Sequence, residues 1–302
     1  MKKELPELGL CCLFKEEPIK FRTYTFKKIS SMENSEAREK ILTVWDNNIE
    51  SLQKAFNYCK ENNISSYRIG SDIFPQYDRV LYLLSKNDID IYQKKLQELN
   101  THDLVLSMHP GQHVNMGSPK PDVIQNSIID LKYHYMFAKN LDIKEINIHL
   151  GGAYGDKESA KKRFIQNMSE LQRDLLDRIT IENDELNYDV HDCIEVAKAL
   201  GIRVTYDIHH ERCYALKRGY SYLEHELAQK SSFNWNGHQR LHISTPRYGY
   251  STPSKSRSHS DYINPSSIPQ WVFSKCYHID VEAKYKEKAI FKLRSKLMKG
   301  NK

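Results

Sequence analysis

The sequence predicts a single-domain α/β protein of the (β/α)8 barrel class, the TIM barrel, over residues 1–302. About eight short runs of apolar and β-branched residues alternate with longer segments of helical periodicity, and this alternation indicates parallel strand pairing. No solenoid repeat and no Gly/Ser linker divides the chain. A doubly wound open sheet is the competing fold. The number of strands and the side chains at their ends favour the closed barrel.

The expected strands are spread over the whole chain. They are residues 8–14, 66–71, 104–109, 145–150, 179–183, 203–208, 240–245 and 277–283. The clearest helix follows Pro121, a favourable first-turn residue, and covers residues 122–140. Its expected buried face carries Val123, Ile124, Ile128, Leu131, Tyr135 and Ala138. A second helical pattern before the second strand carries Val44, Ile49, Leu52, Ala55, Phe56 and Cys59.

Composition excludes several classes of protein. The hydrophobic content of 39% and the charged content of 28% are ordinary for a globular protein. No stretch approaches the roughly 18 apolar residues of a membrane span, and acidic residues near the N-terminus argue against a secretory signal, so we expect a cytoplasmic protein. Six scattered cysteines without a CxxC pair predict neither a disulfide framework nor a thiolate zinc site. The net charge of +6 is compatible with a polyanionic partner but is also typical of a solvated surface.

One long segment breaks the regular alternation. Residues 246–269 are rich in Ser, Pro, Tyr and basic side chains and follow the seventh expected strand. Because the eighth strand still lies beyond them, we interpret these residues as a long functional loop rather than a linker.

Six successive expected strands end in a side chain that can bind a metal ion. These residues are His109, His149, Glu182, Asp207, His242 and Glu282. Two more histidines, His210 and His259, lie just past strand ends. Strand alternation turns the apolar residues toward the helices and leaves the ligand-type residues facing the barrel axis. Any one of them alone is more often structural, for example as a helix cap.

The clustering of six such residues has a physical explanation. Carboxylates and imidazoles that are buried together cost several kcal/mol each unless they are paired or bound to metal. Histidine with carboxylate suits zinc, manganese or iron better than calcium. Two or three such ions can bind a phosphodiester and activate a water molecule. The sequence therefore predicts a multi-metal site at the C-terminal ends of the strands.

Several motifs in this order resemble those of the UV damage endonucleases. They are SMHPGQ with NMGSP (107–119), HLGGAYGDK (149–157), TIENDE (180–185), YDIHH (206–210), HIST (242–245) and VEAK (281–284). The resemblance implies a barrel related to endonuclease IV and to the xylose-isomerase type of sugar isomerase. It also implies an enzyme that acts on damaged double-stranded DNA and nicks the strand on the 5′ side of a lesion. Separately, we expect the protein to be a monomer.

The resemblance further implies a site for three divalent ions, with manganese favoured and zinc or magnesium as alternatives. His109, His149 and Glu182 would hold one ion. A second would be bound by Glu182 as the bridge together with Asp207, His242 and Glu282. A third would be held in part by His210 and His259. Glu182 and Glu282 would also position the attacking water.

The chain departs from the family pattern at several positions. Arg79 stands where the family has a histidine, and we expect it to contact the DNA. Arg240 replaces a lysine that can be carboxylated, and we expect this arginine to contact phosphate as part of the catalytic set. The residues that probe the lesion in the family correspond here to Gln112, His113, Leu10 and Phe14. Further DNA contacts are expected from four residues of the long loop, Arg247, Tyr248, Lys255 and Arg257.

Three rival functions stay open at this point. A sugar isomerase or epimerase would use fewer ions and a narrow pocket. A DNA-binding protein without activity is conceivable because of Arg79 and Arg240, although a complete ligand set argues against it. An endonuclease for abasic sites or another base lesion would fit the replaced probing residues.

Overall fold

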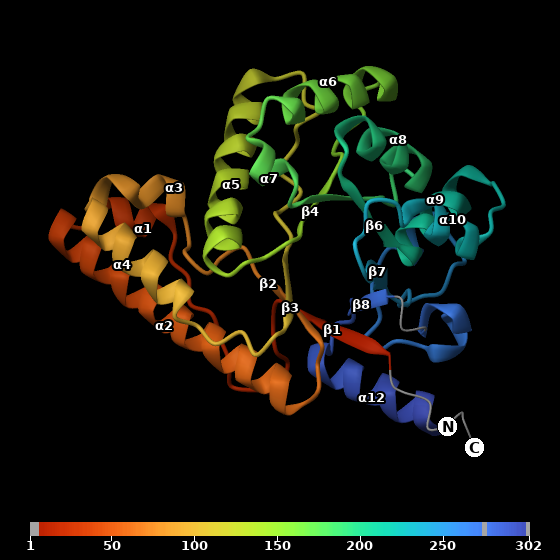
Figure 1. The fold of residues 1–302 in the computed structure, drawn as a ribbon, viewed down its shortest axis with the longest axis horizontal. Coiled ribbons are helices and arrows are strands. Elements are labelled where there is room, and N and C mark those ends of the chain that lie inside the picture. The colour runs from red at the N-terminus through yellow and green to blue at the C-terminus, as the bar shows by residue number, and fades with distance from the viewer. Residues whose placement is uncertain (1–5, 274–276, 300–302) are drawn as a thin grey trace.

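The strands of the protein form a closed parallel barrel in the order β1 to β8, which confirms the predicted fold (Figure 1). The computed structural model describes residues 6–273 and 277–299, so both ends of the predicted domain lie outside the described residues. The strands are β1 Glu7–Cys11, β2 Ser66–Ile69, β3 Val105–Met108, β4 Ile146–His149, β5 Ile179–Glu182, β6 Arg203–Asp207, β7 Gln239–Ile243 and β8 Tyr277–Val281. Each lies within one of the eight expected strands or differs from it by a residue at its start.

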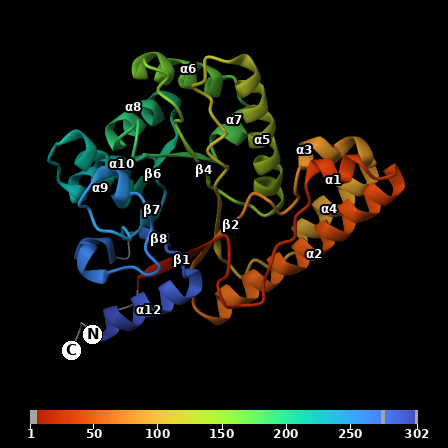
Figure 2. The same ribbon diagram turned by 180° about the vertical axis from the view of Figure 1, so that it is seen from behind.

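Helices surround the barrel on the outside (Figures 1 and 2). The α-helices are α1 Phe26–Ser30, α2 Asn34–Glu61, α3 Tyr77–Val80, α4 Lys86–Gln97, α5 Pro121–Asn140, α6 Lys157–Ser169, α7 Arg173–Leu176, α8 Val190–Leu200, α9 Ile208–Arg218, α10 Glu224–Ser231, α11 Pro253–Ser256 and α12 Lys286–Lys299. The described residues also form three 3-10 turns, η1 Leu81–Leu83, η2 Pro265–Ser267 and η3 Gln270–Phe273. Among the described residues, no helix is long and apolar enough to cross a bilayer.

Helices α1 to α4 form a lobe at one side of the barrel (Figures 1 and 2). Its centre is Trp45, whose ring stacks on Phe74 with 4.3 Å between centroids and meets the edge of Tyr92 at 5.2 Å. The apolar face expected before the second strand is buried in α2 from Val44 to Cys59, as predicted. Aromatic pairs of this kind contribute about 0.5–1.5 kcal/mol beyond their buried area.

The buried face of α5 differs from the prediction. Ser127 and His134 are buried on it, whereas Tyr135 is only partly buried and bonds Asp174. The two polar residues tolerate burial because they are hydrogen-bonded. Ser127 Oγ donates to the carbonyl of Val123, and both ring nitrogens of His134 have partners.

The barrel interior is polar from the level of β4 to β6. Asn147 and Thr180 are hydrogen-bonded at 2.9 Å, and Thr180 bonds Thr205 at 3.0 Å. The outward residues of the same strands, Ile146 and Ile148, are buried under the helices. This alternation places the polar side of each strand on the barrel axis.

Candidate metal centre

Glu182 lies at the centre of the predicted ligand cluster and is only 1% exposed. Its Oε2 lies 3.2 Å from Nε2 of His109 and 4.0 Å from Nε2 of His149. Its Oε1 lies 3.1 Å from Nδ1 of His210 and 3.2 Å from Nδ1 of His242. One carboxylate therefore contacts four imidazoles from four different strand ends, which is the geometry of a bridging ligand.

The strand register explains this convergence. His149 and Glu182 are the last residues of β4 and β5, and they are directly paired. Asp207 of β6 is likewise paired with His242 of β7. Neighbouring strands lie about 4.8 Å apart. Two sets of ligand atoms, His109–His149–Glu182 and Glu182–Asp207–His242, each lie within 4.8 Å of one another.

Glu282 and His259 extend the cluster on the side of β7. Glu282 Oε1 lies 3.5 Å from Nδ1 of His242, and its Oε2 lies 3.8 Å from Nδ1 of His259. His210 reaches Asp207, with 3.7 Å between Nδ1 and Oδ2. All eight predicted ligands thus belong to one connected group of side chains.

His259 reaches the cluster because the loop of residues 246–269 folds back on itself. Pro246 and His259 form an antiparallel bridge, and the amide of Arg247 donates to the carbonyl of Ser258 at 2.6 Å. The amide of Ser260 donates to the carbonyl of Thr245 at 2.7 Å. These hydrogen bonds hold the two ends of the loop together beside β7. The returning segment of the loop carries the candidate ligand His259.

The electrostatics of the cluster suit a divalent ion. Burial opposes ionisation of Glu182, but the neighbouring imidazoles, His242 first, hold the pKa of its carboxyl well below the usual value. Burial likewise opposes the charge on His242, yet Glu182 and Glu282 raise the pKa of its imidazole to about 9. Burial is the main reason that the pKa of Asp207 is raised. In the described chain, Asp207 Oδ2 and His242 Nδ1 are buried without a hydrogen-bond partner. Two orphaned ligand atoms that face each other at 3.8 Å fit a bound cation.

Arg68 of β2 is a site residue that the sequence reasoning missed. Its Nη1 lies 2.6 Å from Oε1 of Glu282. Burial opposes ionisation of Glu282, but Arg68 and then His242 lower the pKa of its carboxyl. Arg68, His259 and Glu282 line a cavity of about 360 Å³ together with Lys284. The sequence did contain a signal for this residue. Arg68 alternates with Tyr67 and Ile69 on the same strand, so its side chain points to the opposite face, toward the barrel axis.

Arg240 does not occupy the position that was predicted for it. It is 1% exposed, and its Nε and Nη2 bond Glu145 at 2.6 and 3.1 Å while Nη1 bonds Asp280 at 2.7 Å. A guanidinium held by two buried carboxylates cannot reach a phosphate, so the predicted phosphate contact is wrong. Asp280 Oδ2 in turn lies 3.5 Å from Nε2 of His242. Arg240 therefore lies behind the candidate ligand His242.

The first strand also differs from the lesion-probing prediction. Leu10 is fully buried in the barrel wall, so it cannot contact DNA. Phe14 is only partly buried and packs edge-on against Tyr58 at the margin of the core, with 5.3 Å between ring centroids. The strand ends at Cys11 because Cys12 adopts a left-handed φ of 62°. The turn exposes Leu13 instead, at 53%.

The other predicted DNA-contacting residues lie at the surface, in two groups. Gln112 shares a cavity of about 200 Å³ with the candidate ligand His149 and with Arg257. His113 and Arg79 line a separate cavity of about 400 Å³, in which His113 bonds Asp130 at 2.9 Å.

Three predicted contacts of the long loop, Arg247, Tyr248 and Lys255, are exposed. Arg257 is less free than they are, because its Nη2 lies 2.6 Å from Glu185. The basic loop therefore offers two cationic side chains that form no ion pair within the described part of the chain.

The fold and this cluster together define a class, the (β/α)8 barrels with a histidine–carboxylate group at the C-terminal ends of the strands. Within that class, the family model "UV-endonuclease UvdE" matches residues 6–302, and the chain belongs to this family. The resemblance predicted from the motifs is thereby confirmed.

Relatives with assigned names agree with this. The UV DNA damage endonuclease of Nostoc sp. is 28% identical over 99% of this chain and 92% of its own length. That of Clostridium perfringens is 32% identical over 79% of this chain, which spans 58% of that longer relative.

Solved structures support the fold alone. The crystal structure of SacUVDE matches with a TM-score of 0.82 at 24% identity, over 98% of this chain and 99% of that one. Endonuclease IV from Thermus thermophilus matches with a TM-score of 0.58 at 12% identity, over 98% of both chains.

Proposed function

We propose that the protein is a divalent-metal-dependent DNA repair endonuclease that hydrolyses the phosphodiester on the 5′ side of a damaged nucleotide. The observation that carries this proposal is the bridging position of Glu182 among four imidazoles, in a chain of the UV-endonuclease family. A buried carboxylate with so many potential ligands around it is costly to maintain without a bound cation.

The ligand sets follow from the contacts. His109 and His149 would share one ion with Glu182, and Asp207 and His242 would share a second with the same carboxylate. When bound, such ions act as Lewis acids that activate water and neutralise charge on the departing oxygen. Manganese is the ion that we favour, with zinc and magnesium as alternatives.

The protein's own side chains hold the ligands in place. Asn147 donates a hydrogen bond to Glu182 and fixes the orientation of its carboxylate. Arg68 does the same for Glu282. Outer groups of this kind commonly change metal affinity or activity about 10–100-fold when they are removed.

The DNA would lie across the C-terminal face of the barrel. Arg68 and Lys284 line the cavity beside Glu282, and Arg247 and Lys255 add exposed positive charge. Leu13 is the exposed apolar side chain next to β1, and it replaces Leu10 beside the partly buried Phe14 as the proposed wedge in the duplex. Family membership favours a UV photoproduct as the lesion. Because the probing positions differ from the family pattern, an abasic site is the alternative, and the assay must offer both.

The test is a nicking assay with end-labelled duplexes that each carry one lesion. With manganese, we expect a single cut on the 5′ side of the lesion that leaves 3′-hydroxyl and 5′-phosphate ends. Glu182→Gln keeps the volume of the side chain but removes the bridging charge, and we expect roughly a thousandfold loss of rate, or about 4 kcal/mol of transition-state stabilisation. The exposed loop variant Lys255→Gln is the matched control and should retain chemistry while binding DNA more weakly. Absence of cleavage with manganese, zinc and magnesium on every lesion would refute the proposal.

The sugar isomerase alternative receives less support. Family membership favours DNA as the substrate. The cavities beside the cluster carry arginine and lysine side chains rather than an enclosed neutral pocket. The predicted cytoplasmic location and monomeric state stay predictions.

A further inference from the structure

A second group of potential metal ligands lies at the opposite end of the barrel from the metal centre. Glu7 is the first residue of β1, His278 is the second residue of β8, and His238 directly precedes β7. Glu7 and His278 are paired in the register of the two strands. The three side chains therefore lie at the N-terminal ends of three adjacent strands, whereas Glu182 and its partners lie at the C-terminal ends.

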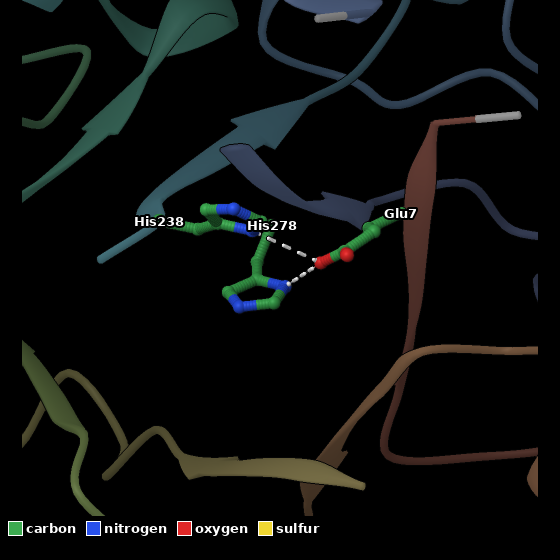
Figure 3. Close-up of side chains that lie close together, drawn as sticks. All are labelled: Glu7, His238 and His278. Carbon is green, nitrogen blue, oxygen red and sulfur yellow. Dashed lines mark hydrogen bonds and ion pairs between the residues drawn. The ribbon is translucent and has the colours of Figure 1, made fainter. Parts of the chain in front are cut away.

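Nδ1 of each imidazole lies close to the same carboxylate oxygen of Glu7 (Figure 3). Glu7 Oε2 lies 2.6 Å from Nδ1 of His278 and 3.3 Å from Nδ1 of His238. The two rings are 5.0 Å apart between centroids and inclined at 51°. One ligand atom from each residue lies within 4.8 Å of the other two.

From this geometry we propose that Glu7, His238 and His278 form a second site for a divalent transition-metal ion, of the zinc type. Two imidazole nitrogens and one carboxylate oxygen are a ligand set that zinc uses, at distances of roughly 2.0–2.2 Å. Tetrahedral bonds of that length separate ligand atoms by roughly 3.3 Å. The distance from Nδ1 of His238 to Oε2 of Glu7 already matches this value. The distance from Nδ1 of His278 to the same oxygen needs to increase by less than about 1 Å.

An ordinary ion pair explains the geometry less well. Although Nδ1 of His278 is close to Glu7, it is buried and makes no hydrogen bond of acceptable direction within the described residues. Its nitrogen is thus not aimed at the oxygen, and a cation beside both atoms would satisfy it. Calcium and magnesium are disfavoured, because these hard ions select oxygen ligands and two of the three donors are imidazoles.

The surroundings give an ion access to the site. His238 and His278 line a cavity of about 670 Å³ at this face, so a water molecule or a further ligand can complete the coordination. An ion here would connect β7 and β8 to β1, and the pairing of β8 with β1 is the one that closes the barrel. We therefore assign the site a structural role that does not depend on the proposed nuclease activity.

The experiment compares zinc binding by the full-length wild type and by His238→Ala/His278→Ala. Both proteins are stripped with chelator, titrated with zinc chloride by calorimetry, and analysed for metal after dialysis. We expect the double variant to bind one zinc ion fewer per chain and to lose part of the zinc-dependent rise in melting temperature. His191→Ala removes an exposed imidazole of α8 and should behave as the wild type. Equal zinc content and equal stabilisation in the double variant and the wild type would overturn the proposal.

Two further measurements keep the test independent of folding and of nuclease activity. The single variant His238→Ala removes the more exposed imidazole and should fold, and we expect its zinc affinity at this site to fall about tenfold or more. Glu182→Gln should retain this zinc ion although it disrupts the metal centre. Unchanged lesion nicking by His238→Ala with manganese would separate the two sites, and unchanged zinc affinity in His238→Ala would reject this one.

Discussion

At the scale of single residues, His242 shows how groups behind the ligands shape the site. Its Nδ1 faces Glu182, while its Nε2 faces Asp280, which is itself held by Arg240. A carboxylate behind a ligating imidazole orients the ring and raises its basicity. The chain thus builds a carboxylate–histidine arrangement with an arginine as its anchor.

This arrangement predicts that Asp280→Asn weakens metal binding while leaving the ligands in place. We expect the affinity for manganese to fall about 10–100-fold, because the neutral amide no longer places a negative charge behind the imidazole and so no longer raises its basicity. Isothermal titration of the stripped protein measures the change. Ser231→Ala is a suitable control, since it removes a buried hydrogen bond within helix α10, to the carbonyl of Ala228. An Asp280→Asn protein with wild-type manganese affinity would rule out the positioning role.

Arg240 itself gives a prediction about stability. Its removal in Arg240→Met would leave Glu145 and Asp280 as neighbouring buried carboxylates without their cation. Breaking a buried charge network in this way typically costs about 3–5 kcal/mol of the free energy of unfolding. Urea denaturation measures it, and Arg240→Lys should lose less because it keeps the charge. A loss in Arg240→Met below about 1 kcal/mol would mean that the network contributes little.

The sequence could predict which residues gather at the strand ends, but not which partners each buried side chain faces. The gathering of the eight candidate ligands could be predicted, because histidines and carboxylates at strand ends meet wherever parallel strands end together, although their role as ligands stays a prediction. The prediction for Leu10 was wrong because this residue lies inside β1 and is fully buried, and a run of apolar letters does not show where the strand ends and exposed residues begin. Arg240 was wrong because its partners Glu145 and Asp280 come from other strands, and the sequence does not state which buried charges pair.

At the scale of elements, α4 illustrates local control of a helix end. Ser85 is the N-cap and accepts from the amide of Asp88, whose carboxylate accepts from the amide of Ser85. Arg38 of α2 bonds the same carboxylate and connects the two helices of the lobe. This capping box closes the first turn of a twelve-residue helix.

The capping box predicts a specific dependence of stability on pH. The hydrogen bond from Arg38, against the effect of burial, lowers the pKa of Asp88 to about 2, below its ordinary value of 3.8. A lowered carboxyl pKa contributes stability that is complete above pH about 4 and is lost as the pH falls toward 2. Ser85→Ala should cost about 0.5–2 kcal/mol at neutral pH. In Asp88→Asn the loss of stability between about pH 4 and pH 2 should be smaller than in the wild type, as measured by urea unfolding at each pH. An identical acid profile would contradict the assignment.

Elements were easier to predict than their faces. The eight strands follow from β-branched runs, and α2 follows from a clean apolar stripe that is buried as expected. Helix α5 was placed correctly, but its buried face was not, because Ser127 and His134 are polar residues that become core residues once they are hydrogen-bonded. Periodicity of apolar residues cannot detect a polar side chain that is satisfied by its neighbours.

At the scale of the whole molecule, the barrel carries two groups of candidate metal ligands at opposite ends of one polar interior. Glu182 and its imidazoles lie at the C-terminal face, and Glu7 with its two imidazoles lies at the N-terminal face. Between them, Arg240 and its carboxylates occupy the axis. Closure of the barrel brings both groups together from distant parts of the chain, so neither exists in the unfolded chain, and ions that bind them stabilise the folded state by linkage.

This linkage predicts that chelation lowers the melting temperature without changing the fold. An ion at about a hundred times its dissociation constant stabilises by about 2.7 kcal/mol, and each kcal/mol corresponds to roughly 2–4 °C for a chain somewhat shorter than this one. We therefore expect excess manganese to raise the melting temperature of the stripped wild type by about 5–10 °C in calorimetry. The rise should disappear in Glu182→Gln, because both main ligand sets use that carboxylate, and should persist in His238→Ala/His278→Ala, because the centre at the other face is intact. A rise of equal size in Glu182→Gln would show that the ion binds elsewhere.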